Sequence, residues 1–225
     1  MKDAKMTKTG RFRKSPDGPL RNKERTKRKI LAAVGKIFSK EGHKSLNIKK
    51  ISEVAGIDRK MIYTYFGSLE GLLNTYFIQK DFWTPFHNEF ISKLLEGNKS
   101  IMGKDIFTIL KAQFDAVMDN KQFEKAIHWE ISEKSQIMRK VSDEREQVGQ
   151  KLFMLMQDCF KNTTVDVPGT LALQIGGIYY IALHSKINGS TFCGIDVNTT
   201  QGRLRIERVL KQNISDLFKK GKHLT

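Results

Sequence analysis

Apolar and polar residues follow one another along this chain with the spacing of helices. Apolar side chains recur three and four positions apart, and no segment of useful length shows the period of two that marks a strand. The four prolines, Pro16, Pro19, Pro85 and Pro168, leave long stretches without a helix breaker. The pattern predicts an all-α protein.

Three helices are predicted between residues 23 and 67. The first covers about 23–40 and ends at Gly42, since a glycine commonly follows the last turn of a helix. Its apolar stripe is formed by Ile30, Ala33, Val34, Ile37 and Phe38. The second begins after the N-cap Asn47 and stops at Gly56, and the third begins after the N-cap Asp58 and ends near Phe66. The second helix is expected to bury Ile48, Ile51, Val54 and Ala55.

The remainder of the chain is predicted to form longer helices. Ser68 caps a fourth helix, whose stripe is Leu69, Leu72, Leu73, Tyr76 and Phe77. Pro85 separates this helix from one that reaches about Glu96. Further helices are predicted at about 104–119, 122–138, 141–161, 169–188 and 200–220, with turn residues at the joints between them.

The helix predicted over 169–188 is apolar on two sides. One stripe consists of Leu171, Ile175, Ile178, Tyr179 and Ala182, and the other of Leu173, Gly177, Tyr180, Ile181 and His184. A helix of this kind must be covered on both sides. We therefore expect it to pair with the helix over 200–220 and with the same two helices of a second subunit, forming a homodimer around a two-fold axis. The alternative is a monomer in which the last helix alone covers it.

Charge is distributed unevenly along the chain. Residues 1–66 carry 19 Lys and Arg against 6 Asp and Glu, a net charge of +13, whereas residues 67–225 carry only +3 of the total of +16. Residues 1–22 have almost nothing to bury and are interpreted as a flexible basic arm. A basic segment on a nearly neutral remainder indicates a module that binds a polyanion. The alternative is a solvated basic tail without a partner.

The segment 47–66 has the order helix, glycine turn, helix, which is typical of a helix-turn-helix. In such units the second helix enters the major groove of double-stranded DNA. The helical wheel places Met61, Ile62 and Tyr65 on the inner side of that helix, and the DNA-facing candidates on the opposite arc or at neighbouring helix starts. The candidate DNA-binding residues are Asn47, Lys49, Arg59, Lys60, Tyr63, Thr64 and Ser68. The alternative is that they are ordinary surface residues of a small bundle.

The residues around this unit closely resemble the N-terminal domain of the tetracycline-repressor (TetR/AcrR) family over about residues 25–77. The resemblance rests on Ile30-Leu31-Ala32-Ala33, Phe38, Glu41-Gly42, Ile51, Ala55-Gly56-Ile57, Ile62-Tyr63, Tyr65-Phe66 and Ser68-Leu69-Glu70-Gly71-Leu72. It implies a dimeric repressor with a three-helix DNA-binding head (residues 23–67), a linking fourth helix, and a helical domain over 68–225 that dimerises and binds an effector. It also implies a palindromic operator.

Carried over by position, Tyr63 resembles the family's phosphate-contacting tyrosine, and residues 59–64 resemble its base-reading surface. The chain departs from the family at two positions. Leu69 stands where a phosphate-contacting lysine is usual, and Lys60 stands where the family often has a small residue. The operator sequence therefore does not follow from the relatives.

Rings and methionines at helical spacing, among them Phe153, Met156 and Tyr179, are expected to form either plain core or the lining of an apolar pocket. The preferred ligand-binding residues are Phe114, Trp129, Tyr180 and His184. The effector is expected to be small and apolar or aromatic, because the region offers few internal charges to an ionic ligand. The alternative is a DNA-binding regulator that has no small-molecule effector and is gated by a protein partner.

Signals for other classes of protein are missing from the sequence. It contains no Walker loop, dinucleotide-binding fingerprint or nucleophile elbow, and its five histidines have no second ligand at a convincing spacing. We therefore expect no enzyme activity, cofactor or metal. No apolar run is long enough to cross a membrane and no secretory signal is evident. Cys159 and Cys193 are interpreted as free thiols of a cytoplasmic protein.

Overall fold

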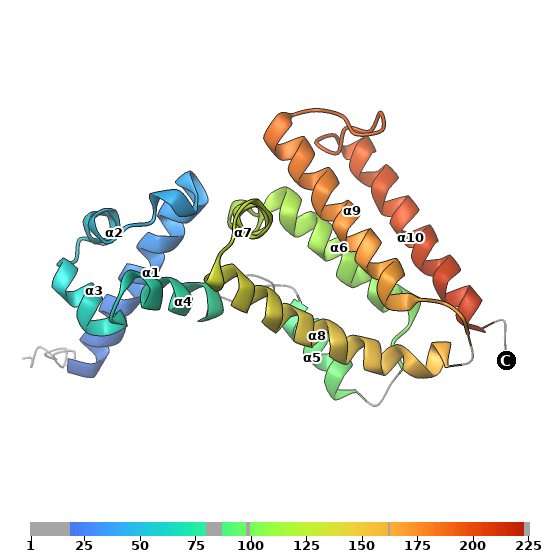
Figure 1. Cartoon of the computed structure of the whole chain (residues 1–225), viewed down its shortest axis with the longest axis horizontal. Coiled ribbons are helices and arrows are strands. Elements are labelled where there is room, and N and C mark those ends of the chain that lie inside the picture. The colour runs from blue at the N-terminus through green and yellow to red at the C-terminus, as the bar shows by residue number, and fades with distance from the viewer. Residues whose placement is uncertain (1–18, 80–86, 98–99, 162, 223–225) are drawn as a thin grey trace, which may run out of the picture.

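The computed structural model describes residues 19–79, 87–97, 100–161 and 163–222, and this part of the chain is helical (Figure 1). The all-α prediction is confirmed. The elements are α1 (Pro19–Glu41), the 3-10 turn η1 (His43–Ser45), α2 (Ile48–Ala55), α3 (Arg59–Phe66), α4 (Leu69–Gln79), α5 (His87–Glu96), α6 (Gly103–Asp119), α7 (Lys121–Ser132), α8 (Gln136–Phe160), α9 (Val167–Asn188) and α10 (Thr200–Lys222).

Local capping rules set the starts and ends of the short helices, as predicted. The Asn47 Oδ1 atom accepts a hydrogen bond from the Lys50 amide at 2.9 Å, and Asp58 Oδ1 accepts one from the Lys60 amide at 2.7 Å. Gly56 ends α2 with φ of 63°, in the left-handed region that glycine occupies at low cost. These caps satisfy amide groups that the first turn of a helix leaves without partners.

Two predictions for the N-terminal region are wrong. Helix α1 begins at Pro19 rather than near Lys23, because proline suits the first turn of a helix, where an amide donor is not needed. Residues 19–22 of the predicted arm are therefore helical, and residues 1–18 lie outside the described part. Val54 is 41% exposed instead of buried, because Ile51 takes the inward position of α2.

The break between α7 and α8 also differs from the prediction. Helices were expected over 122–138 and 141–161, but α7 ends at Ser132 and α8 starts at Gln136. The cap is Ser135, whose Oγ accepts a hydrogen bond from the Met138 amide at 3.2 Å. The turn carries no glycine or proline, so helical periodicity continues through it in the sequence.

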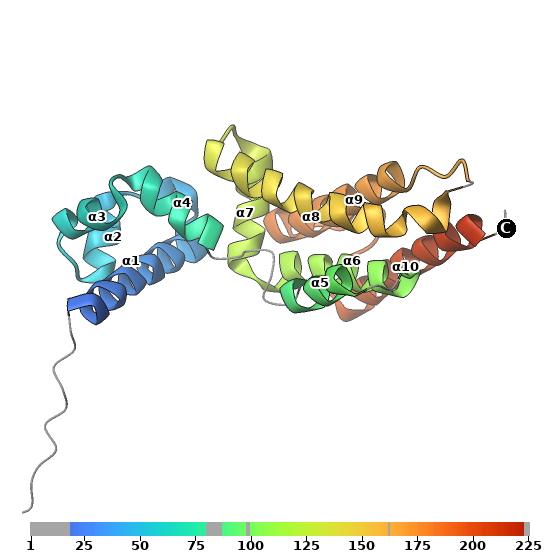
Figure 2. The same ribbon diagram turned by 90° about the horizontal axis from the view of Figure 1, so that it is seen from below.

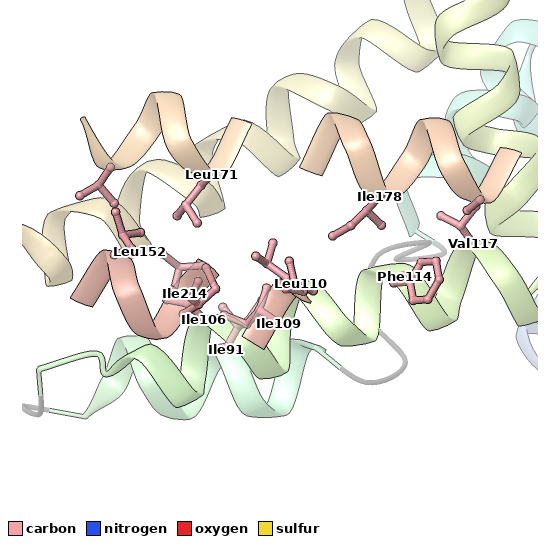
Figure 3. Close-up of a cluster of buried hydrophobic side chains, with 14 of the residues drawn as sticks. Ile91, Ile106, Ile109, Leu110, Phe114, Val117, Leu152, Leu171, Ile178 and Ile214 are labelled. Carbon is pink, nitrogen blue, oxygen red and sulfur yellow. The ribbon is translucent and has the colours of Figure 1, made fainter. Parts of the chain in front are cut away.

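Helices α1–α4 form one end of the molecule, α5, α6 and α8–α10 form the other, and α7 lies between the two groups (Figure 2). Each end has a hydrophobic core. The larger core lies among α6, α8, α9 and α10, where Phe114, Ile178 and Ile214 are buried (Figure 3). The other core, which we call the head core, joins α1–α4 to residues of α7 and of the start of α8. These contributed residues are Ala126, Trp129, Ile137, Met138 and Val141.

Candidate nucleic-acid interface and internal cavity

Helix α3 presents the predicted DNA-facing residues to solvent. Arg59, Lys60 and Thr64 are exposed, and the Tyr63 ring is 53% exposed although it is large and apolar. On the other side of the helix, Ile62 is fully buried in the head core. An exposed aromatic ring beside two basic side chains suits contact with a sugar-phosphate backbone, and an arginine can read guanine bidentately.

The turn between α2 and α3 is held by hydrogen bonds. The Ser52 hydroxyl donates to the Ile57 carbonyl at 2.7 Å, and the Ile57 amide donates back to the Ser52 carbonyl at 3.2 Å. The reciprocal pair fixes how α3 leaves α2, so the exposed side chains of α3 start from a rigid base. The Thr64 hydroxyl donates a hydrogen bond to the Lys60 carbonyl at 2.8 Å, so the methyl group is the end of this side chain that is left to contact another molecule.

The remaining DNA-binding candidates lie at the N-termini of α2 and α4. Lys49 is exposed in the first turn of α2, whereas its neighbour Lys50 forms an ion pair with Glu41. Asn47 and Ser68 are exposed but use their side-chain oxygens as caps, the latter accepting from the Gly71 amide at 3.0 Å. Leu69, which stands where the resembled family usually has a phosphate-contacting lysine, packs against the head core.

A cavity of about 700 Å³ lies between α6, α8 and α9, close to the end of α4. Most of its walls are aliphatic or aromatic. The apolar lining includes Ile91, Ile106, Ile109, Leu110, Val148, Leu152, Phe153, Met156, Leu171 and Ile175, several of which are drawn in Figure 3. Its volume and apolar walls are typical of a pocket for a small organic ligand.

Polar groups reach this cavity from three helices: Gln113 on α6, Arg145 on α8 and Tyr179 on α9. The Arg145 Nη2 atom lies 2.6 Å from Oε1 of Glu130 on α7 in a partly buried ion pair. Burial raises the pKa of the Tyr179 hydroxyl to about 12, because an ionised phenolate would lose its hydration there. The sequence-based expectation of few internal charges therefore misses one partly buried ion pair.

The structure does not bring the four preferred ligand-binding residues together. Trp129 packs in the head core, with its ring centroid 5.4 Å from that of Phe77. Phe114 is fully buried in the larger core without lining the cavity. Tyr180 and His184 lie on the outer side of α9, with centroids 5.8 Å apart. Since one residue turns a helix by about 100°, Tyr179 faces the cavity where Tyr180 was expected.

Helices α9 and α10 also carry exposed apolar side chains on the outside of the molecule. Leu173 is 81% exposed, and Tyr180, Leu204 and Val209 are each more than half exposed. The inner stripe of α9 faces its own subunit, since Leu171, Ile178 and Ala182 are buried. Of the two stripes predicted for this helix, one is thus covered within the subunit, whereas in the other Leu173 and Tyr180 are exposed and Ile181 packs partly against the core.

Two further features bear on the class of protein. No helix in the described ranges has the length and apolarity needed to cross a bilayer. The same residues contain no group of three or more His, Cys, Asp or Glu side chains that could hold a metal ion. Cys159 and Cys193 are free thiols, as predicted.

Comparison with known proteins gives one partial sequence match. No protein-family model matches the chain. The HTH-type transcriptional repressor NicS of Pseudomonas putida is 49% identical over 49 residues, which is 22% of this chain and 23% of that repressor. The chain therefore spans less than a quarter of the length of this curated relative.

Solved structures give matches over most of the chain. FadR of Bacillus subtilis, determined in complex with stearoyl-CoA, superimposes with a TM-score of 0.58 at 16% identity, over 86% of this chain and 98% of FadR. A TetR-family transcription regulator from Marinobacter aquaeolei superimposes with a TM-score of 0.56 at 16% identity, over 86% and 97% of the two chains. The chain therefore has the fold of the TetR-family transcription regulators, the family that its N-terminal residues resemble.

Proposed function

We propose that this protein is a DNA-binding transcriptional regulator that reads a palindromic operator as a homodimer. The observation that carries the proposal is α3, a short and rigidly based helix that exposes Arg59, Lys60, Tyr63 and Thr64 together. In a helix-turn-helix this helix lies in the major groove, while the N-terminus of α2 contacts the phosphates. The net charge of +13 on residues 1–66 supplies the electrostatic part of the affinity. The matched segment of NicS, a repressor, favours repression.

The homodimer is proposed from the open stripe of α9 and the exposed apolar residues of α10. An 81% exposed leucine beside other exposed apolar side chains favours a protein partner over water. A second copy related by a two-fold axis covers this surface with an identical one. It also provides the second head, and two half-sites one helical turn apart require head spacing of about 34–36 Å.

We further propose that a small molecule in the cavity regulates DNA binding. Helix α7 connects the two regions: the Tyr76 hydroxyl of α4 donates to Gln122 Oε1 at 3.2 Å, and Gln122 Nε2 donates to the Gly35 carbonyl of α1 at 3.2 Å. A ligand that binds one orientation of α7 and α8 more tightly than another increases the population of that orientation, and with it of one spacing between the two heads. The size of this shift is set by the difference between the two affinities. FadR, which shares the fold, was solved with a bound acyl compound.

The test of DNA binding is selection of sequences from a random double-stranded library, followed by fluorescence anisotropy with the selected sequence. We expect enrichment of an inverted repeat and binding at least about 10³-fold tighter than to scrambled DNA. A library that returns no sequence preference would contradict the proposal. Selected DNA that stays bound in the presence of every ligand that fills the cavity would instead favour gating by a protein partner.

A further inference from the structure

The cavity between α6, α8 and α9 continues into a second one. The second cavity has a volume of about 480 Å³ and lies at the C-terminal end of α8, against Val165 and Val167. The two cavities share three lining residues, Phe153, Met156 and Pro168, so they adjoin. Together they follow α8 from Arg145 to Lys161, a distance of about 24 Å at the rise of an α-helix. We call this combined space the slot.

The walls of the slot are left open by glycine on two facing helices. Gly149 of α8 and Gly176 of α9 both line the larger cavity, and a Cβ atom added to either would meet nothing within 4 Å. Glycine weakens a helix by its conformational freedom, and here no packing contact explains its presence. The two positions widen the slot between α8 and α9, where a side chain would otherwise narrow it.

One end of the slot is polar but carries little net attraction for an anion. Among the described lining residues of the larger cavity Arg145 is the only basic one, and Glu130 already binds it. Glu144 and Glu146 are exposed at the same end. A ligand carboxylate would face these three acidic side chains, and Glu130 already holds the Nη2 atom of the guanidinium.

Two neutral groups at this end have hydrogen-bonding capacity to spare. The buried Gln113 Oε1 and the Tyr179 hydroxyl oxygen have no hydrogen-bond partner of normal geometry within the described residues. The charge of Arg145 acts against the rise in the pKa of Tyr179 that burial causes. The phenol keeps its proton, so it can donate a hydrogen bond to a ligand. A ligand group that both donates and accepts would satisfy Gln113 and Tyr179 together.

We propose that the slot binds an elongated, uncharged amphiphile, with a hydroxyl or primary amide at Gln113 and Tyr179 and a hydrocarbon chain lying along α8. This assignment rests on the proposed function, because it names the class of molecule that would regulate DNA binding. An uncharged head avoids the acidic side chains, and the chain meets the apolar side chains of the slot, whose far end also carries Gln157, Asp158 and Lys161. Each added methylene buries more apolar surface.

The direct test is isothermal titration calorimetry of the full chain with 1-decanol, sodium decanoate, decyltrimethylammonium and 1-hexanol. We expect 1-decanol to bind most tightly, and 1-hexanol about 250-fold more weakly, since each of the four additional methylenes contributes roughly fourfold. Decanoate and decyltrimethylammonium should each bind at least about tenfold more weakly than the alcohol. Equal or tighter binding of either ion would overturn the uncharged head group, and equal affinity of the two alcohols would overturn the elongated slot.

Variants locate the site. Gly149→Leu should weaken 1-decanol binding at least about tenfold by filling the slot, and Tyr179→Phe should narrow the preference for 1-decanol over decanoate by removing one polar partner. Met154 lies on the solvent side of α8, 64% exposed, so Met154→Gln should bind 1-decanol like the unmodified protein. Unchanged affinity in both slot variants, with folding verified by circular dichroism, would contradict the site. The titrations contain no DNA, so a chain that binds 1-decanol but no operator refutes the proposed function alone.

Discussion

The imidazole of His43 and the indole of Trp129 stack with parallel planes and ring centroids 4.6 Å apart. His43 lies in the turn that follows α1, in the end of the molecule formed by α1–α4, whereas Trp129 lies on α7. The His43 Nε2 atom is also 2.5 Å from Oε1 of Glu133, at the end of α7. One side chain of the head thus lies against Trp129 of α7 and close to Glu133, the residue that follows α7, next to the Phe38 and Phe77 rings.

Removing the indole should destabilise the protein strongly. Trp129→Ala deletes a large side chain that is only 7% exposed, and substitutions of this kind cost about 3–5 kcal/mol. The free energy of unfolding, measured by urea titration with circular dichroism, checks the value. Ile131→Ala, on the same helix but 66% exposed, is the matched control and should stay within about 0.5 kcal/mol of the unmodified protein. Equal losses of unfolding free energy in the two variants would mean that the contacts of Trp129 with the head core contribute little to stability.

Arg59 should contribute sequence preference as well as affinity. Arg59→Ala should weaken operator binding by about 1–3 kcal/mol and reduce the discrimination between operator and scrambled DNA. Lys36 is exposed on α1, away from α3, so Lys36→Ala removes the same charge without removing a base contact. Fluorescence anisotropy on both DNAs separates the two effects. If Arg59→Ala weakens binding to operator and to scrambled DNA by the same factor, Arg59 contacts phosphate rather than a base.

The N-terminal residues should add affinity without adding much specificity. Residues 1–18 contain six Lys and Arg against two Asp. Deleting them should weaken binding to operator and random DNA alike. The slope of log affinity against log salt should become shallower by about 0.9 for each phosphate that the shortened chain no longer neutralises. A slope that stays the same after the deletion would show that this segment does not contact DNA.

Charged residues on the open faces of α9 and α10 should separate the dimer. Leu173→Glu with Val209→Glu places two carboxylates where the proposed interface is apolar, so sedimentation should show monomers that bind the operator much more weakly than the unmodified dimer. Met154→Glu makes the same kind of change on the exposed side of α8 and should leave sedimentation unchanged. A double variant that still sediments as a folded dimer would place the interface elsewhere.

Local features of the sequence are sufficient to predict the end of the molecule formed by α1–α4. Asn47, Gly56 and Asp58 act through hydrogen bonds with residues no more than four positions away, so their roles follow from short-range rules. The orientation of α3 follows from the same kind of pattern, because Ile62 is apolar and its neighbours on the other arc are polar. The break at Ser135 does not follow, because a serine cap without glycine or proline is a weak signal.

The ligand-binding residues depend on long-range packing and are not predictable in the same way. Tyr179 and Tyr180 are adjacent, chemically identical and both in apolar stripes, so only the packing of α9 on α6 decides which faces the cavity. Trp129 resembles a pocket residue in the sequence because its ring is large and polar at one edge. Its neighbours Phe38 and Phe77 are more than fifty positions away, and no periodicity in the sequence connects them.

The sharing of the head core with α7 and α8 has a consequence for how the chain unfolds. A fragment ending at residue 79 would lack Ala126, Trp129, Ile137, Met138 and Val141, which complete that core. We therefore expect the head to lose its structure together with α7 and the first turns of α8 rather than as a separate cooperative unit. Chimeric regulators that exchange heads between proteins of this fold would accordingly need to transplant this second, distant segment together with α1–α4.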